Sequence, residues 1–391
     1  MKVLFLDQSG KLGGAELCLA DIAEHFKQTS LVGVFDEGTF PQYLRQLEIP
    51  VKIFNKQTLQ VQKASSLLAG LKSLNQLIPL AAAIAQCSRQ YDLIYANTQK
   101  ALVVGALSSL LSRRPLVYHL HDIVSPEHFS RINRRIIITL ANRAVLIIAN
   151  SQASRDAFIQ AGGRADCVHV VYNGFRSEDY ANSIDSAAQR QLRSEVLSLD
   201  SNQSDDTSFI VGHFSRLSPW KGQHVLIEAL QYCPENVTAL LVGDALFGEQ
   251  DYVQQLRQQV KSLKLENRVK FLGFRSDIPQ LMSACDLVAH TSTAPEPFGR
   301  VIVEAMLCGT PVVAAAAGGA IELVDPGRTG WLTPPGDAKA LAEVITTCQN
   351  QPDWANVVAD QAKAQAVRRF NLETVNADIA RLLGNIKQQK R

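Results

Sequence analysis

Short apolar runs alternate with longer amphipathic segments along the whole chain. In the first half, the apolar runs predict strands at residues 3–6, 31–35, 93–96, 116–119, 145–149 and 168–172. The alternation starts again after residue 208 and predicts strands at residues 209–214, 239–242, 269–272, 287–290 and 311–315. Strands that are apolar on both faces and alternate with helices are typical of parallel sheets covered on both sides. The pattern therefore predicts an α/β protein with two doubly wound, Rossmann-like domains.

A polar stretch between the two series marks the domain boundary. Residues 177–208 are rich in Ser, Asp and Gln, which predicts a helical stretch and an exposed loop. We therefore expect an N-terminal domain at 1–180, a linker at 181–208 and a C-terminal domain at 209–368. The tail at 369–391 has apolar residues at helical spacing and predicts a helix that packs back across the junction. Open parallel sheets bind ligands beyond the carboxyl ends of their strands, so we expect the domains to face each other across a cleft.

Composition removes several classes of protein. Hydrophobic residues make up 46% and charged residues 19% of the 391 positions, which excludes a disordered chain. Lys plus Arg number 39 against 37 Asp plus Glu, so nucleic-acid binding by bulk positive charge is not expected. Seven scattered cysteines without a C-x-x-C pair indicate reduced thiols. The acid at Asp7 argues against a signal peptide. The apolar stretch at 136–149 is too short and too interrupted for a membrane-spanning helix. We expect a cytoplasmic protein that could still sit at the inner face of the membrane.

One segment combines a helix start with two acids. The sequence EPFGRVIVEAMLCGTP begins at Glu296; its proline favours a helix start, and its second glycine favours the helix end. The backbone N–H groups expected to be free at this helix start belong to Phe298, Gly299, Arg300 and Val301. Such groups bind anions, and the helix dipole adds to the effect. Glu304, about 7–8 Å further along the axis, could accept hydrogen bonds from a ribose, and Glu296 could bind sugar hydroxyls. An ordinary capped helix would have the same pattern, but Glu304 lies in an apolar run that should be buried.

A second segment places two cations where a predicted strand ends. FSRLSPWKG puts Arg216 and Lys221 on either side of a turn that precedes the next helix. Opposite the anion-binding helix start, the two cations could clamp a diphosphate. Taken alone, they could equally be solvated surface charges.

Together, these segments resemble the retaining glycosyltransferases of family 4, which have the GT-B fold. The family pattern G-R-L-x-x-x-K-G corresponds to SRLSPWKG at 215–222, and His213 and Phe214 stand where the family often has glycine. The two glutamates of the first segment match E-P-F-G-x-x-x-x-E-A, which has two Glu residues eight apart. Further family-like segments follow in order at 242–244, 271–292 and 318–337. The resemblance therefore covers the second domain nearly end to end.

The resemblance implies roles for other residues. The loop expected beside the nucleobase consists of Gly273, Phe274 and Arg275. In the first domain, the glycine-rich loop SGKLGGAE would lie close to the donor phosphate and the acceptor through Gly13 and Gly14. His121, in YHLHDIVS, matches a family histidine that contacts the transferred sugar, and His119 on the same strand is an alternative.

The resemblance also implies a reaction: transfer of a hexose from a nucleotide-sugar with retention of anomeric configuration. The chain has no D-x-D motif, so we expect no metal and no cofactor, with Arg216, Lys221 and the helix start stabilising the leaving phosphate. UDP-glucose is the first expectation for the donor, ahead of other UDP-hexoses and GDP-mannose. The acceptor would be a hydroxyl of a glycan or lipid-linked sugar in surface polysaccharide biosynthesis. Basic residues that could attract anionic lipid headgroups, or form a solvated helix face, are Arg113, Arg114, Arg131, Arg134 and Arg135.

Other functions stay open at this point. A nucleotide-sugar epimerase or a phosphorylase could use the same architecture without the same transfer reaction. A dinucleotide oxidoreductase is suggested by Gly10, Gly13 and Gly14 with Asp36, but the spacing is G-x-x-G-G and not G-x-G-x-x-G. A sugar-binding module without activity would not need both cations and both acids.

Overall fold

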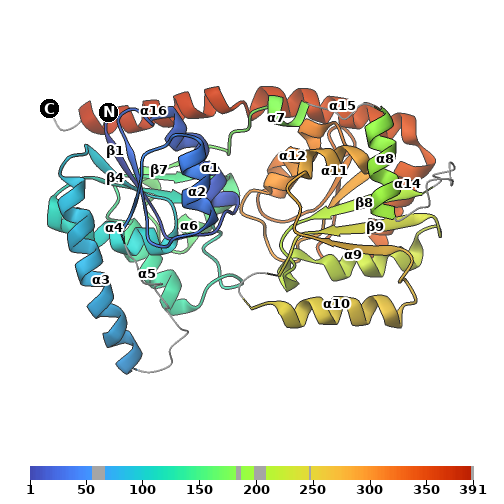
Figure 1. Ribbon diagram of the computed structural model, residues 1–391, viewed down its shortest axis with the longest axis horizontal. Coiled ribbons are helices and arrows are strands. Elements are labelled where there is room, and N and C mark those ends of the chain that lie inside the picture. Colours follow the sequence, from blue (N-terminus) through green and yellow to red (C-terminus); the bar gives the residue numbers. More distant parts are fainter. Residues whose placement is uncertain (55–66, 182–185, 198–207, 246–247, 389–391) are drawn as a thin grey trace. The chain divides into compact units, whose positions relative to one another are not determined.

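The chain forms two compact units, each built on one parallel sheet. The computed structural model describes residues 1–54, 67–181, 186–197, 208–245 and 248–388. Unit 1 comprises Met1–Gly174 and Leu372–Arg391, and unit 2 comprises Phe175–Asn371. Each unit is an α/β domain with helices on both faces of its sheet (Figure 1). The predicted α/β fold with two doubly wound domains is therefore confirmed.

Unit 1 has the strand order β3-β2-β1-β4-β5-β6-β7, and all its strand pairs are parallel. Its elements are β1 (Val3–Asp7), α1 (Gly14–His25), β2 (Leu31–Val34), α2 (Thr39–Gln46), β3 (Val51–Ile53), α3 (Leu67–Ser88), β4 (Leu93–Ala96), α4 (Gln99–Ser112), β5 (Leu116–Leu120), α5 (Arg131–Ala141), β6 (Leu146–Ala149), α6 (Gln152–Gln160), β7 (Val168–Val170) and α16 (Leu372–Gln388).

Helices cover both faces of this sheet, and successive side chains of a strand point to opposite faces, so each strand contributes side chains to both buried layers. In β1, Leu4 and Leu6 pack with α3 and α4, which lie side by side (Figure 1). Val3 and Phe5 pack into the opposite layer, which includes α1 and the apolar stripe of α16. The last helix of the chain therefore completes the core of the first unit.

Unit 2 has the strand order β10-β9-β8-β11-β12-β13, again with parallel pairs. Its elements are α7 (Glu178–Ala181), α8 (Ser186–Leu197), β8 (Phe209–Phe214), α9 (Gln223–Ala229), β9 (Val237–Val242), α10 (Gln250–Ser262), β10 (Val269–Gly273), α11 (Ile278–Ala284), β11 (Leu287–His290), α12 (Arg300–Cys308), β12 (Val312–Ala315), α13 (Ala320–Leu323), β13 (Trp331–Thr333), α14 (Ala338–Asn350) and α15 (Pro352–Arg369). The short 3₁₀ helix η2 (Pro219–Lys221) lies between β8 and α9. Because β8 and β11 are neighbours, the loops that follow them start side by side at one edge of the sheet.

The segment expected to be a linker differs from the prediction. Helix α8 packs against α11, and Arg193 on α8 forms an ion pair with Asp286 (Nη1···Oδ2 3.1 Å) and donates to the Ser208 carbonyl (2.7 Å). These contacts make α8 part of unit 2. The exposed loop expected within 177–208 falls mainly on 198–207, outside the described residues. The division between the units follows Gly174, not residue 180.

Two edge strands, β3 and β13, were not predicted. Each has three residues, and each lies at an end of its sheet. Short edge strands carry little apolar periodicity, because only one neighbour and few side chains define them.

Candidate functional site

Glu296 is the centre of a buried polar cluster in unit 2. Its carboxylate Oε2 lies 2.6 Å from Lys221 Nζ and 3.1 Å from His290 Nε2, and it accepts a hydrogen bond from Ser292 Oγ at 3.1 Å. Glu296 is only 8% exposed. Burial alone would raise the pKa of the Glu296 carboxyl, but Lys221 and His290 outweigh burial and hold that pKa well below its usual range. The cluster therefore holds an ionised carboxylate against an ammonium group.

Glycines bring the two halves of this cluster together. Gly222, directly after Lys221, has a left-handed backbone (φ 74°), and a Cβ there would lie 1.9 Å from the Thr291 carbonyl oxygen. Thr291 Oγ1 donates to the Gly222 carbonyl (2.7 Å) at this close approach. The loop after β8 thus reaches the loop after β11 because residue 222 has no side chain.

A second close approach fixes the backbone of Glu296 itself. Gly319 N donates to the Glu296 carbonyl at 2.7 Å, and a Cβ on Gly318 (φ 62°) would lie 2.3 Å from that oxygen. The Gly318–Gly319 pair is therefore more than a simple turn, because its backbone packs directly against the Glu296 loop.

Arg216 and Lys221 both lie near one aromatic ring. The Arg216 guanidinium carbon is 5.7 Å, and Lys221 Nζ 4.0 Å, from the centre of the Trp220 ring. Cation–π contacts of this kind hold long side chains in place. The main chain of this turn is fixed by Gln223, whose amide donates to the Arg216 carbonyl at 2.9 Å. The structure thus places the two predicted cations together at the end of β8.

The N-terminus of α12 has the predicted position but more packing than predicted. Gly299 is the N-cap residue with φ 97°, and no side-chain cap bond is present among the described residues. The Phe298 ring is buried against Phe175 (centroids 6.4 Å, interplanar angle 22°) and Phe370 (5.9 Å, 86°), so its side chain serves the core. The backbone start of the helix follows directly from this aromatic anchor.

Glu304 is paired on the same helix. Arg300 Nε lies 3.3 Å from Glu304 Oε1, and both side chains are less than 15% exposed. Burial raises the pKa of the Glu304 carboxyl, and Arg300 opposes that shift. The Arg300 guanidinium also lies 4.5 Å from the centre of the Phe175 ring. Its side chain therefore orients Glu304, which the sequence did not indicate.

The loop predicted to lie beside a nucleobase follows β10. Gly273 has φ 66°, and the next residue, Phe274, is 76% exposed while its N–H donates to Asp244 Oδ2 at 3.2 Å. Arg275 forms ion pairs with Asp277 (2.6 Å) and Glu195 (3.4 Å), which raise the pKa of its guanidinium. An exposed ring on a tied-down loop is able to stack on a planar ligand.

In unit 1, the glycine-rich loop leads into α1. Gly13 is the N-cap of the helix, Gly14 is its first residue, and a Cβ on Gly13 would lie 2.8 Å from Glu16 Oε2. Burial, with the negative charge of Asp7 as a second cause, raises the pKa of Glu16 to about 7. Burial also raises the pKa of Asp7 to about 6, against hydrogen bonds from Asn97 and the backbone. Two nearby carboxyl groups therefore titrate close to neutral pH.

His119 and His121 have different surroundings. The His119 ring is fully buried with Nδ1 2.8 Å from the Tyr95 hydroxyl, and burial, with His121 as a second cause, lowers the pKa of His119 well below its usual value. His121 lies directly beyond the end of β5 and is half-buried, and its Nε2 lies 2.9 Å from Asn97 Oδ1. Of the two predicted histidines, His121 is the one at the rim of the sheet.

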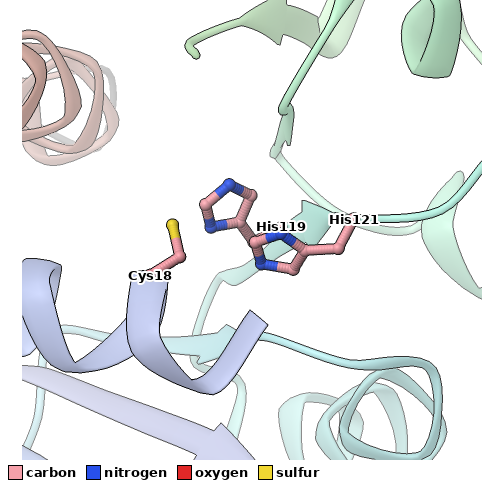
Figure 2. Close-up of side chains that lie close together, drawn as sticks. All are labelled: Cys18, His119 and His121. Carbon is pink, nitrogen blue, oxygen red and sulfur yellow. The ribbon is translucent and has the colours of Figure 1, made fainter. Parts of the chain in front are cut away.

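Figure 2 shows a third side chain, Cys18 of α1, facing the ring of His119. One ligand atom from each of Cys18, His119 and His121 lies within 4.8 Å of the others. The two imidazole rings are close together and tilted, with centroids 3.9 Å apart at an interplanar angle of 36°. Each of the three side chains has a hydrogen-bond partner: Tyr95 for His119, Asn97 for His121 and Asn173 for Cys18. We make no metal assignment for this cluster.

The predicted basic cluster lies at the end of α4 and on α5: Arg113, Arg114, Arg131, Arg134 and Arg135. Two isoleucines of α5 are exposed next to these arginines, Ile132 by 72% and Ile136 by 44%. Among the described residues, no helix has the length and apolar character needed to cross a membrane.

Sequence reasoning missed four of the polar residues that build these sites. They are Asp7, Asn97, His290 and Ser292. Three of them share one signal: each is the last residue of a buried apolar strand or follows it directly. The carboxyl ends of parallel strands are where such sheets place functional groups.

Comparison with known proteins gives matches over both units. The family described as "Glycosyl transferases group 1" matches residues 198–365, and the family described as "Glycosyltransferase Family 4" matches residues 12–179. Among curated proteins, the D-inositol 3-phosphate glycosyltransferase of Corynebacterium glutamicum is 27% identical over 308 residues, 75% of this chain and 72% of that protein.

Among solved structures, Anabaena Alr3699/HepE in complex with UDP-glucose is 58% identical, with a TM-score of 0.89 over 98% of this chain and 100% of that one. The same protein is also known in complex with UDP and glucose, at the same identity and TM-score. The lipopolysaccharide glycosyltransferase WaaG is similar in fold, at 17% identity and a TM-score of 0.71 over 97% and 98% of the two chains.

Proposed function

The chain belongs to the group 1 glycosyltransferases of family 4, with the GT-B fold, and from that premise we propose that it transfers glucose from UDP-glucose with retention. The acceptor is a hydroxyl of a glycan or a lipid-linked sugar, and the pathway makes a surface polysaccharide. The observation that carries the choice of donor is the 58% identity, over 98% of the chain, to a protein crystallised with UDP-glucose.

The polar cluster of unit 2 supports a role in diphosphate and sugar recognition. Lys221 already lies 2.6 Å from a carboxylate, so its ammonium group is positioned to meet an anion at this point. A donor diphosphate would replace Glu296 as the partner of Lys221, with Arg216 beside it on Trp220. Glu296 would then accept hydrogen bonds from the hydroxyls of the transferred sugar.

The helix α12 would hold the rest of the phosphate and the ribose. Backbone N–H groups at Gly299, Arg300 and Val301 carry the positive end of the helix dipole. Glu304, held by Arg300, would accept hydrogen bonds from ribose hydroxyls. Phe298 contributes its backbone, since its ring is used in the core.

The uracil ring would lie against the loop of Gly273, Phe274 and Arg275. The exposed Phe274 ring offers a stacking face, and the Gly273 backbone allows close approach. In unit 1, we assign Gly13 and Gly14 to the donor phosphate and acceptor, and His121 to the transferred sugar.

Bond cleavage leaves negative charge on the diphosphate and positive charge on the anomeric carbon. Fixed positive charge at the phosphate therefore stabilises the transition state more than the ground state. Arg216, Lys221 and the α12 terminus supply that charge, so the proposed reaction needs no divalent cation. The leaving phosphate can take the acceptor proton on the face it leaves, which retains the configuration.

Exposed Ile132 and Ile136 among the arginines of α5 support peripheral contact with an anionic membrane from the cytoplasmic side. A lipid-linked acceptor would be met at such a surface.

A panel of nucleotide-sugars tests the proposal. UDP-glucose should raise the melting temperature more than UDP-galactose, UDP-N-acetylglucosamine or GDP-mannose. Transfer to acceptor glycans should then give an α-linked product, because the donor is an α-glucoside. A β-linked product would refute retention, and a larger shift with GDP-mannose would refute the donor. Conversion of the donor to another nucleotide-sugar without acceptor would identify an epimerase instead.

A further inference from the structure

Three neighbouring strands of unit 1 place a row of polar side chains at one edge of the sheet. β1 ends at Asp7, Asn97 directly follows β4, and His121 directly follows β5. The order β1-β4-β5 makes these strands adjacent, and Asn97 N continues the ladder by donating to the Leu6 carbonyl at 3.0 Å. Asp7 and Asn97 are both fully buried. Buried polar groups at a sheet edge are costly unless each is hydrogen-bonded, so their partners define their role.

The side chains of this row are joined by hydrogen bonds. Asn97 Nδ2 donates to Asp7 Oδ2 at 2.8 Å and to the Ala15 carbonyl at 3.1 Å. Asn97 Oδ1 lies 2.9 Å from His121 Nε2. At its other end, Asp7 Oδ1 accepts from the Ser9 N–H at 2.8 Å.

The partners fix which way the Asn97 amide points. A backbone carbonyl can only accept, and so can an ionised carboxylate. Both partners of the Nδ2 end, Ala15 O and Asp7, therefore require an NH₂ group there. A flipped amide would set its oxygen against two acceptors inside the protein, where such contacts are expensive. Oδ1 must then face His121, and only a protonated Nε2 can donate to it.

We propose that Asp7 and Asn97 are positioning residues that lock His121 in the Nε2–H tautomer, which leaves Nδ1 as the acceptor atom of the neutral ring. An imidazole in this state accepts a hydrogen bond from a hydroxyl group and gives none from Nδ1 to a phosphate oxygen. The inference rests on the proposed function, in which His121 contacts the transferred sugar, and it names the chemistry of that contact as a sugar hydroxyl donating to Nδ1.

The neighbouring ring of His119 supports the same arrangement. It lies 3.9 Å from the His121 ring, centre to centre, and is itself fixed by Tyr95. Ring plane and tautomer are thus set by different neighbours. A change at Asn97 should therefore alter the proton position more than the ring position.

The test is nitrogen-15 NMR of the full chain labelled only in its histidines, without ligand, at pH 8. Protonated and bare ring nitrogens have well-separated shifts, and a His121→Gln spectrum assigns the signals. Histidine in water already favours Nε2–H but exchanges between both tautomers, so its two ring nitrogens give averaged shifts. A locked His121 should instead show one fully protonated nitrogen, Nε2, and one fully bare nitrogen, Nδ1. Averaged His121 shifts, or a protonated Nδ1, in the wild type overturn the proposal.

Asn97→Ala is the decisive variant, because it removes the amide that faces His121. Without the lock, the His121 nitrogens should move to averaged shifts from both tautomers. Asn150→Ala is the matched control: Asn150 is also buried, directly follows the next strand, β6, and accepts from Ser154 Oγ at 2.9 Å. It should leave the His121 signals in place. His121 signals that stay unchanged in Asn97→Ala would overturn the proposal.

Kinetics then separate this inference from the proposed function. Asn97→Ala should lower kcat for glucosyl transfer about tenfold to a hundredfold, with KM for the donor changed less than about threefold. An unchanged kcat would refute the positioning role. If no donor supports transfer at all, the proposed function fails, while the tautomer result stands or falls on the spectra alone.

Discussion

Replacing Lys221 with methionine removes the ammonium group that faces Glu296 while keeping a chain of similar length. Glu296 then stays in its buried position with His290 and Ser292 as its remaining partners. The change tests whether the cluster of unit 2 is a true ion pair in the unliganded protein.

The structure sets the size of the effect. The two charged atoms are 2.6 Å apart, and the side chains are 15% and 11% exposed. At an effective dielectric constant of about 20, their attraction is about 6 kcal/mol before the cost of desolvation is subtracted. Removing one partner of a buried pair typically costs about 3–5 kcal/mol, because it leaves the other charge uncompensated. His290 can still pair with Glu296, so we expect Lys221→Met to lower the free energy of unfolding of unit 2 by about 3 kcal/mol.

Urea unfolding of the wild type, Lys221→Met, Glu296→Gln and the double variant measures this as a double-mutant cycle. The expected coupling energy is at least about 2 kcal/mol, since each single variant strands its partner. Lys339→Met is the control, because Lys339 is exposed and should cost less than about 0.5 kcal/mol.

The dependence on pH has a definite sign. The pKa of Glu296 is depressed in the folded wild type, so its stabilising effect is present above its ordinary pKa of 4.5 and is lost as pH falls through the depressed value. Without Lys221, that pKa rises, and protonation of Glu296 relieves the buried charge. The difference in unfolding free energy between the wild type and Lys221→Met should therefore become smaller from pH 8 to pH 4. If Lys221→Met lowers the unfolding free energy by less than about 1 kcal/mol at pH 8, and the double-mutant cycle shows no coupling energy, the ion-pair argument is refuted.

Four further outcomes are expected. Arg216→Ala should lower kcat for glucosyl transfer by about 10²–10³, while Arg257→Ala, at an exposed position, should stay within about twofold. Excess EDTA should leave the rate of transfer unchanged, and complete loss that Mg²⁺ restores would contradict metal independence. The raised pKa of Glu16, about 7 against an ordinary 4.5, means that this group stabilises the fold below about pH 4.5 and that this effect is lost as pH rises through 7. Between pH 5 and pH 8, the unfolding free energy of the wild type should therefore fall by up to about 3 kcal/mol more than that of Glu16→Gln. Ile136→Asp should reduce sedimentation with anionic lipid vesicles, whereas Val367→Asp, at an exposed position of unit 2, should not.

The fold was predictable because most strands are long enough to be apolar on both faces. β8, for example, was predicted at 209–214 and observed as Phe209–Phe214. β3 and β13 were missed because three residues at a sheet edge carry no clear period. The polar composition of helix α8 predicts a linker, although one side of the helix packs on α11. A polar segment can belong to a domain when a few contacts, such as Arg193 with Asp286, fix it.

The site was predictable only as a set of positions. The motifs located Lys221 and Glu296, but 75 positions apart in sequence they gave no sign of being ion partners. That contact depends on the neighbouring placement of β8 and β11 and on the close approach at Gly222. His290 was missed because it ends a strand of apolar character, where a single polar residue has no pattern of its own.

The Lys221–Glu296 pair also constrains how a donor would be recognised under the proposed function. A buried ammonium group needs a counter-charge, and Glu296 supplies it when no ligand is bound. Among the described residues, a nucleoside diphosphate that binds Lys221 leaves the buried Glu296 carboxylate with His290 and Ser292 as its side-chain partners. A complete nucleotide-sugar offers phosphate oxygens to Lys221 and hydroxyl donors to Glu296, so both groups keep partners. Recognition of the phosphate and of the sugar would therefore be coupled through one ion pair, and the intact donor would be favoured over the diphosphate product.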